Sequence, residues 1–157
     1  MKARHIRVIF FSAFLVGTLD IAAAIALSLL SGANPLTMLR FIASGVFGLE
    51  AFTGGWLYSL YGLAFHYFIA LIWTLIFFNL SRWIPVTRRY RIASGILFGI
   101  VVWLAMNFIV LPLSNTPALP FDFRSAITGG FVLIVAIGIP LGYLSAHFFH
   151  QQKTASG

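Results

Sequence analysis

Three polar side chains lie inside apolar stretches of the sequence, where an ionisable group or an amide could do chemistry. Asp20 lies within GTLDIAAAIALSLL, His66 within GLAFHYFIALIW and Asn107 within VWLAMNFIVLPLSNTP. A carboxyl group beside an imidazole can form a hydrogen-bonded pair, an ion pair or a proton relay, and an amide can bond to either group. These three residues are therefore the candidates for a polar site in apolar surroundings.

The residue types leave three interpretations of this site open. The first is a polar clasp that holds helices in register. The second is a site for protons or substrate in a small transporter or channel, because buried ionisable groups often mark such pathways. The third is a hydrolase in which Ser59, seven residues before His66, acts as a nucleophile. The third is the weakest, because the sequence has no nucleophile elbow and no oxyanion-hole motif.

Further polar residues are secondary candidates. Glu50 and Arg40 are ten residues apart in a region expected near a membrane surface, where simple solvation accounts for them. His147 and His150 are three residues apart, which is a start for a metal site but lacks a third ligand at a clear spacing. The chain has no cysteine, so thiolate sites are excluded. No cofactor and no metal is expected.

The composition says which elements must position these residues. The chain of 157 residues is 61% hydrophobic and 8% charged, and its mean hydropathy is +0.99. Soluble domains have about 25% charged residues, so the expected solvent is a lipid bilayer. Ten basic residues against three acidic ones could suggest nucleic acid. We expect no nucleic-acid partner, because the cations lie at the ends of apolar runs rather than on one face of a domain.

Four apolar runs reach the length of about 20 residues that a membrane-spanning helix needs. They predict helices at about 8–30, 55–80, 92–113 and 125–149 in one domain, 1–157. The first run is longer than the apolar core of a signal peptide and contains Asp20, so we expect a retained helix. The fold class predicted is all-α: an integral membrane four-helix bundle with an additional surface or re-entrant helix on the outer side.

Depth and helical faces predict which polar residues meet. Asp20 and His66 each lie about midway along antiparallel runs, so at about 1.5 Å rise per residue they should share one depth. Asn107 should lie about one turn nearer the outer face. A charged aspartate at mid-membrane costs about 2.5–3.5 kcal/mol unless it is protonated or paired. Small residues share the faces of all three polar residues, which favours close packing there. These small residues include Ala13, Gly17, Ala24, Ser28, Gly62, Ala70, Gly95 and Gly99.

The distribution of basic residues predicts the orientation. With four spans, eight of the ten lysines and arginines fall on one side, and only Arg40 and Arg124 fall on the other. Basic residues favour the cytoplasmic side, so both termini should be cytoplasmic.

On the outer side, Asn34 can cap a helix whose first residue is Pro35, which predicts the surface helix at about 35–48. Pro112, Pro117 and Pro120 should end helical structure in the second outer connection, and Pro140 should kink the fourth helix.

Three stretches of the chain resemble a group of small, uncharacterised bacterial inner-membrane proteins with four membrane helices. These stretches are GLAFHYFIALIW, VWLAMNFIVLPLSNTP and NPLTMLRFIASGVFG. The resemblance implies a bacterial inner-membrane location and no particular activity. The chain is also similar in size to small multidrug transporters, which have an acidic residue in their first helix, but its outer helix and proline-rich loop depart from them.

The function expected is non-enzymatic: binding within the membrane, as an accessory or stabilising subunit of a membrane complex. The partners expected are the lipid bilayer and either another membrane protein or further copies of the chain. The alternative is a small proton-coupled transporter or channel that uses Asp20 and His66.

Overall fold

The computed structural model describes residues 2–117 and 122–154, with side chains described over 5–117 and 122–151. Pro120 lies outside these residues. The described chain is helical and contains no strand. Four of its helices are long and apolar enough to cross a membrane, which is the property of a multi-pass membrane protein. These helices are His5–Leu30, Trp56–Trp83, Arg91–Leu113 and Phe123–Gln151.

The long helices pack in two contacting pairs. Helix α1 (Lys2–Leu30) packs against α4 (Trp56–Trp83), and α6 (Arg91–Ala105) packs against α9 (Ile139–Thr154). Helix α9 also contacts α1 and α4, so the pairs share one core. Side chains from all four helices fill this core. Its fully buried apolar residues are Val16, Phe77, Phe78, Val102 and Leu141.

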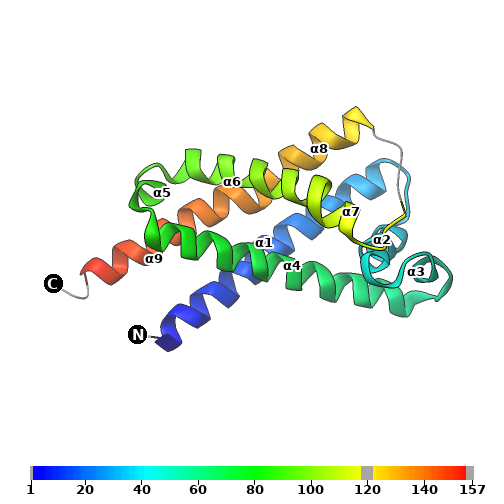
Figure 1. The fold of residues 1–157 in the computed structure, drawn as a ribbon, viewed down its shortest axis with the longest axis horizontal. Coiled ribbons are helices and arrows are strands. Elements are labelled where there is room, and N and C mark those ends of the chain that lie inside the picture. The colour runs from blue at the N-terminus through cyan, green and yellow to red at the C-terminus, as the bar shows by residue number, and fades with distance from the viewer. Residues whose placement is uncertain (1, 118–121, 155–157) are drawn as a thin grey trace.

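The short helices lie at the two ends of the molecule. Helix α5 (Pro85–Arg89) joins α4 to α6, and both ends of the chain lie toward α5 (Figure 1). Helices α2 (Pro35–Phe47) and α3 (Glu50–Thr53) lie at the opposite end (Figure 1). The residues expected at the two faces of a membrane are therefore separated along the long axis of the fold.

Two of the long helices contain a wider, π-helical turn just before a proline. Met106–Val110 (η1) joins α6 to α7 (Leu111–Leu113), and Ile134–Gly138 (η2) joins α8 (Phe123–Leu133) to α9. The Leu111 N–H donates to the Met106 carbonyl and the Ile139 N–H to the Ile134 carbonyl, each five residues back. Pro112 and Pro140 follow these turns by two residues. A proline has no N–H and its ring crowds the carbonyl four residues earlier, so the helix widens there.

Glycines let α6 approach the fourth span closely. A Cβ atom added to Gly95 would run into the backbone carbonyl of Gly138, and one added to Gly138 would run into that of Gly95. Gly99 and Gly142 extend the same contact. Because backbone meets backbone here, the two helices gain packing and dispersion contacts that larger side chains would prevent.

Helix α2 is positioned by its cap and by α4. The Asn34 Oδ1 accepts a hydrogen bond of 2.9 Å from the Leu36 N–H, and Pro35 occupies the first turn. Gly48, with φ of 62°, ends the helix in a conformation that glycine adopts most easily. The Ser59 Oγ of α4 donates to the Leu36 carbonyl over 3.0 Å. This bond ties the start of α2 to α4.

Candidate functional site: the Asp20–His66 contact

Asp20 of α1 and His66 of α4 face each other across the contact between their helices. The Oδ2 atom of Asp20 lies 3.9 Å from the Nδ1 atom of His66, and this is the one ion pair in the described part of the chain. The side chains are 15% and 11% exposed. The distance suits an ion pair and is longer than a hydrogen bond. A carboxyl group and an imidazole thus lie together within the apolar length of two membrane-spanning helices.

The contact between the His66 Nε2 atom and α1 shows which of the two ring nitrogens carries a hydrogen. The Nε2 atom lies 2.8 Å from the backbone carbonyl oxygen of Gly17. A carbonyl only accepts, so Nε2 must carry a hydrogen and donate it. In a neutral ring, Nδ1 then presents its lone pair toward Asp20. The 3.9 Å between Nδ1 and the Asp20 Oδ2 atom is too long for a hydrogen bond, so Nδ1 faces the carboxyl group without bonding to it.

Gly17 is what allows α1 and α4 to come this close. A Cβ atom at this position would lie 3.0 Å from Cδ1 of Tyr67 and 3.2 Å from Cβ of Ala70. Both distances are tighter than ordinary van der Waals contact. A side chain at Gly17 would therefore press the helices apart at the level where its carbonyl receives the His66 hydrogen bond.

Tyr67 closes one side of the site through a second contact between the same helices. The Thr18 hydroxyl donates its hydrogen to the Phe14 carbonyl over 2.7 Å. The Tyr67 hydroxyl, 3.0 Å from the Thr18 Oγ1, must then be the donor in that contact. The Tyr67 ring also stacks on Phe14, with centroids 5.6 Å apart and planes 12° apart. These contacts hold the side chain of Tyr67, the residue after His66, in one orientation.

The sequence did not identify Gly17, Thr18 and Tyr67 as members of the site. Gly17 was visible only as one of several small residues on the Asp20 face. The role of its carbonyl has no signature in the side-chain pattern, because every residue has a carbonyl. Thr18 and Tyr67 are ordinary residues of apolar helices, and only the packing of α1 on α4 makes them partners.

Asn107 lies apart from the Asp20–His66 contact. Its side chain is exposed, and its Nδ2 donates to the Trp103 carbonyl of the same helix over 2.9 Å. The polar site expected from the sequence therefore has two of its three members in contact. The third points away from the core.

Ser59 is also separate from His66. It is buried, and its hydroxyl hydrogen is donated to the Leu36 carbonyl. The described contacts of His66 are with Gly17, Asp20 and the ring of Tyr67. The serine–histidine arrangement that a hydrolase needs is therefore not formed by these two residues.

Glu50 and Arg40 do not pair with each other. Glu50 accepts a hydrogen bond of 3.0 Å from the Tyr58 hydroxyl, and the Nε of Arg40 is buried without a partner among the described residues. The His147 Nε2 lies 2.7 Å from the Nε2 of Gln151. In the described residues, no group of three or more His, Cys, Asp or Glu side chains is placed to hold a metal ion.

The fold defines a class, the multi-pass helical membrane proteins, and the site adds a carboxyl–imidazole contact between two of the spans. Comparison of the chain with protein-family profiles, curated proteins and solved structures gives no match. What the site can do therefore follows from its own geometry. It can hold α1 and α4 together through the hydrogen bond from His66 to Gly17, and it places a carboxyl group beside an imidazole.

Proposed function

We propose that this chain is a non-enzymatic membrane protein that binds another helix within the bilayer, as an accessory or stabilising subunit of a membrane complex. The observation that supports this best is the exposed amide of Asn107. It lies six residues before the end of the span Arg91–Leu113, which is about 9 Å along the helix axis. Its neighbours Phe108 and Ile109 are 67% and 56% exposed, as expected of a surface that faces lipid.

An amide on that surface has hydrogen-bonding groups left over. One N–H of Asn107 is used by the Trp103 carbonyl, which leaves its second N–H and its oxygen. Hydrocarbon offers neither a donor nor an acceptor, so such groups are costly when they face lipid. Amide side chains in membrane helices commonly bond to a neighbouring helix for this reason. A partner helix with a polar side chain at this depth would satisfy Asn107.

Cross-linking in native membranes tests the proposal. The chain has no cysteine, so Ile109→Cys introduces a single thiol beside Asn107. We expect a cross-linked product of defined mass, and its mass distinguishes a second copy of this chain from a different protein. Asn107→Leu should abolish the product. Asn79→Leu should not, because Asn79 is an exposed amide near the end of α4 that leads into α5, at the opposite end of the fold from Asn107. A protein that gives no product and purifies alone in mild detergent would refute the proposal.

In this function the four spans form a bundle in a bacterial inner membrane, with both termini cytoplasmic and α2 on the outer side. The support is the charge distribution: α5, the start of α1 and the end of α9 lie toward one end of the fold, and these segments contain most of the basic residues of the sequence. Single cysteines test the orientation. Ser31→Cys should react with an impermeant reagent from outside, and Val86→Cys, at a residue 57% exposed, should not. The reverse pattern would overturn the orientation.

A second candidate function is proton-coupled transport or conduction through Asp20 and His66. The observation that favours it is the Nε2 contact with Gly17, which leaves Nδ1 directed at the carboxyl group of Asp20, so that two groups able to take up a proton lie side by side. The test is flux in proteoliposomes. Asp20→Asn should abolish it, and Glu50→Gln, a matched loss of an acid outside the site, should leave it intact. Absence of flux in the wild type, or full flux in Asp20→Asn, rules this function out.

A further inference from the structure

The end of the molecule near α5 carries arginines that lie against aromatic rings. The guanidinium carbons of Arg82 and Arg89 lie 5.7 Å and 5.6 Å from the ring centroids of the residues that follow them, Trp83 and Tyr90. Contacts of the same kind reach α9, where Arg88 lies 5.0 Å from Phe149 and Arg91 lies 4.4 Å from Tyr143. Stacking on a ring holds a guanidinium in place and leaves the N–H groups at its edge free to donate. We call Arg82, Arg88, Arg89 and Arg91 the basic end.

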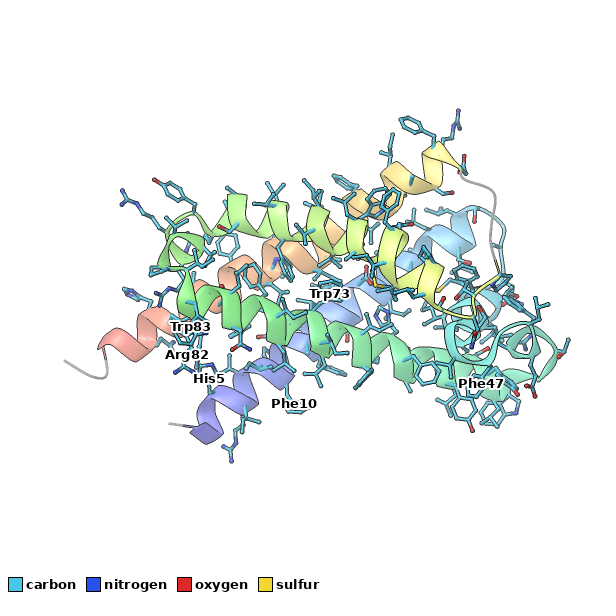
Figure 2. The ribbon with its side chains drawn as sticks, in the orientation of Figure 1. His5, Phe10, Phe47, Trp73, Arg82 and Trp83 are labelled. Atoms are coloured by element: carbon cyan, nitrogen blue, oxygen red, sulfur yellow. The ribbon has the colours of Figure 1, made fainter. Side chains whose placement is uncertain are left out.

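The basic end has no acidic side chain to neutralise it. The sequence contains three acids, and they lie in the middle of α1, at the start of α3 and before α8. The one ion pair in the described residues is that of Asp20 with His66. Figure 2 shows His5, Arg82 and Trp83 at one end of the molecule and Phe47 at the other. Repulsion among these cations favours an anion brought in from outside.

An apolar groove along α4 ends at this basic end. It has a volume of about 470 Å³ and is open to the surface. Seven residues line it: Ile72, Leu75, Ile76, Asn79, Leu80, Trp83 and Ile84. Trp83 therefore belongs both to the groove and to the Arg82 contact. The two features together suit one ligand with an apolar chain and an anionic head.

We propose that the groove on α4 and the basic end form a binding site for an anionic phospholipid. An acyl chain lies in the groove beside Ile76, and the headgroup phosphate accepts hydrogen bonds from the Arg82 guanidinium at the end of α4. The other three arginines add attraction for the negative charge. Basic sites beside membrane helices recognise anionic headgroups in this way, and the planar guanidinium suits phosphate oxygens. A free phosphate ion would gain nothing from the groove, whereas a phospholipid uses both parts.

Retention of lipids by the purified full-length chain tests the site. The protein is equilibrated in mixed micelles that contain equal amounts of phosphatidylglycerol and phosphatidylcholine, and the bound lipids are counted by native mass spectrometry. We expect the wild type to retain the anionic lipid about tenfold over the zwitterionic one. Equal retention of the two lipids by the wild type would overturn the proposal, and this arm needs no variant to fold. Inorganic phosphate, added in place of the anionic lipid, should not bind; binding of phosphate alone would also overturn it.

Paired variants then locate the bound lipid. Ile76→Trp fills the groove and should remove most of the retained anionic lipid, whereas Ile100→Trp, an equal change at an exposed residue of α6, should not. Arg82→Gln should lower the preference for the anionic lipid about fivefold. Arg124→Gln removes the same charge from an exposed residue at the start of α8 and should leave the preference unchanged. Equal losses in the two members of either pair would show an unspecific effect of bulk or net charge and would refute the site.

Discussion

His66 connects two parts of α1 through its two ring nitrogens: Nε2 lies 2.8 Å from the Gly17 carbonyl oxygen, and Nδ1 lies 3.9 Å from the Asp20 Oδ2. Gly17 and Asp20 are three residues apart and thus lie on one face of α1. One ring therefore spans almost a full helical turn. This arrangement sets the register of α1 on α4, whether or not a proton moves through it.

Substitutions at Asp20 should separate hydrogen bonding from charge. In Asp20→Asn an amide N–H can donate to the Nδ1 lone pair, so we expect the free energy of unfolding to change by less than about 1 kcal/mol. In Asp20→Leu an apolar side chain replaces the polar group that Nδ1 faces, and we expect a loss of about 1–3 kcal/mol. Unfolding of both variants in mixed detergent measures the difference. Equal stability of Asp20→Leu and the wild type would show that Asp20 is not part of a clasp.

The glycine contact between α6 and the fourth span should not tolerate a single methyl group. In Gly138→Ala the new Cβ meets the backbone carbonyl of Gly95, which cannot move without shifting the helix. Alanine favours helix by up to about 1 kcal/mol over glycine, but we expect the steric conflict to dominate and destabilise the protein by about 1–3 kcal/mol. Thermal unfolding in detergent checks this.

The matched control for that change is Gly129→Ala. Its Cβ would lie 3.6 Å from the Nε1 atom of Trp103, which is ordinary contact, so stability should be unchanged or slightly higher. If Gly138→Ala behaves like Gly129→Ala, the close approach of the two helices is absent in solution.

The start of α8 should loosen in acid because of Asp122. The Oδ2 of Asp122 accepts hydrogen bonds from the Ser125 hydroxyl over 2.6 Å and from the Ser125 N–H over 2.9 Å. These bonds, that from the hydroxyl first, lower the pKa of Asp122 below its usual 3.8. The folded pKa is thus below the unfolded one. The stabilisation is complete above pH 3.8 and is lost as the pH falls through the lower folded pKa.

Hydrogen exchange of the Ser125 amide measures this loss. Asp122→Asn is the control, because asparagine caps a helix well and does not titrate in this range. At each pH the wild type is compared with the variant, which removes the intrinsic pH dependence of exchange. We expect protection in the wild type to fall relative to the variant on acidification. A constant ratio would show that the Asp122 cap does not contribute.

The hydrogen bond from Ser59 should help to hold α2 against α4. Ser59→Ala removes the hydrogen bond to Leu36 and leaves that carbonyl without this donor, so we expect a loss of about 0.5–1.5 kcal/mol and faster amide exchange in α2. Ser31→Ala is the control, since the Ser31 hydroxyl bonds only to the nearby Ser28 carbonyl. Unchanged exchange in α2 would mean that other contacts hold the helix, such as the close approach of Gly62 in α4 to the Leu39 carbonyl of α2.

Much of the architecture follows from the sequence by counting. Runs of apolar residues predict spanning helices because hydrocarbon forces every backbone group into an internal hydrogen bond. The equal depth of Asp20 and His66 follows from the rise per residue in antiparallel helices. Asn34 and Pro35 predict the start of α2 because capping is a local interaction between neighbours in the chain.

The rotation of each helix about its own axis was not predictable in the same way. Gly95, Gly99, Trp103 and Asn107 follow a strict spacing of four residues, which drifts by about 40° at each step, so Asn107 lies about 120° around the helix from Gly95. The π-helical turn that begins at Met106 changes the phase again. The glycines therefore face the core while the amide faces outward.

By itself, the sequence determined that this is a multi-pass helical protein and that an acid and a histidine lie at one depth within it, because these properties depend on the length and polarity of single segments. Only the tertiary structure decided that Asp20 meets His66, that the Gly17 carbonyl selects the His66 tautomer, and that Asn107 and Ser59 lie elsewhere. Those relationships depend on how several helices pack at once, and packing sets the rotation of each helix through contacts that no single segment contains.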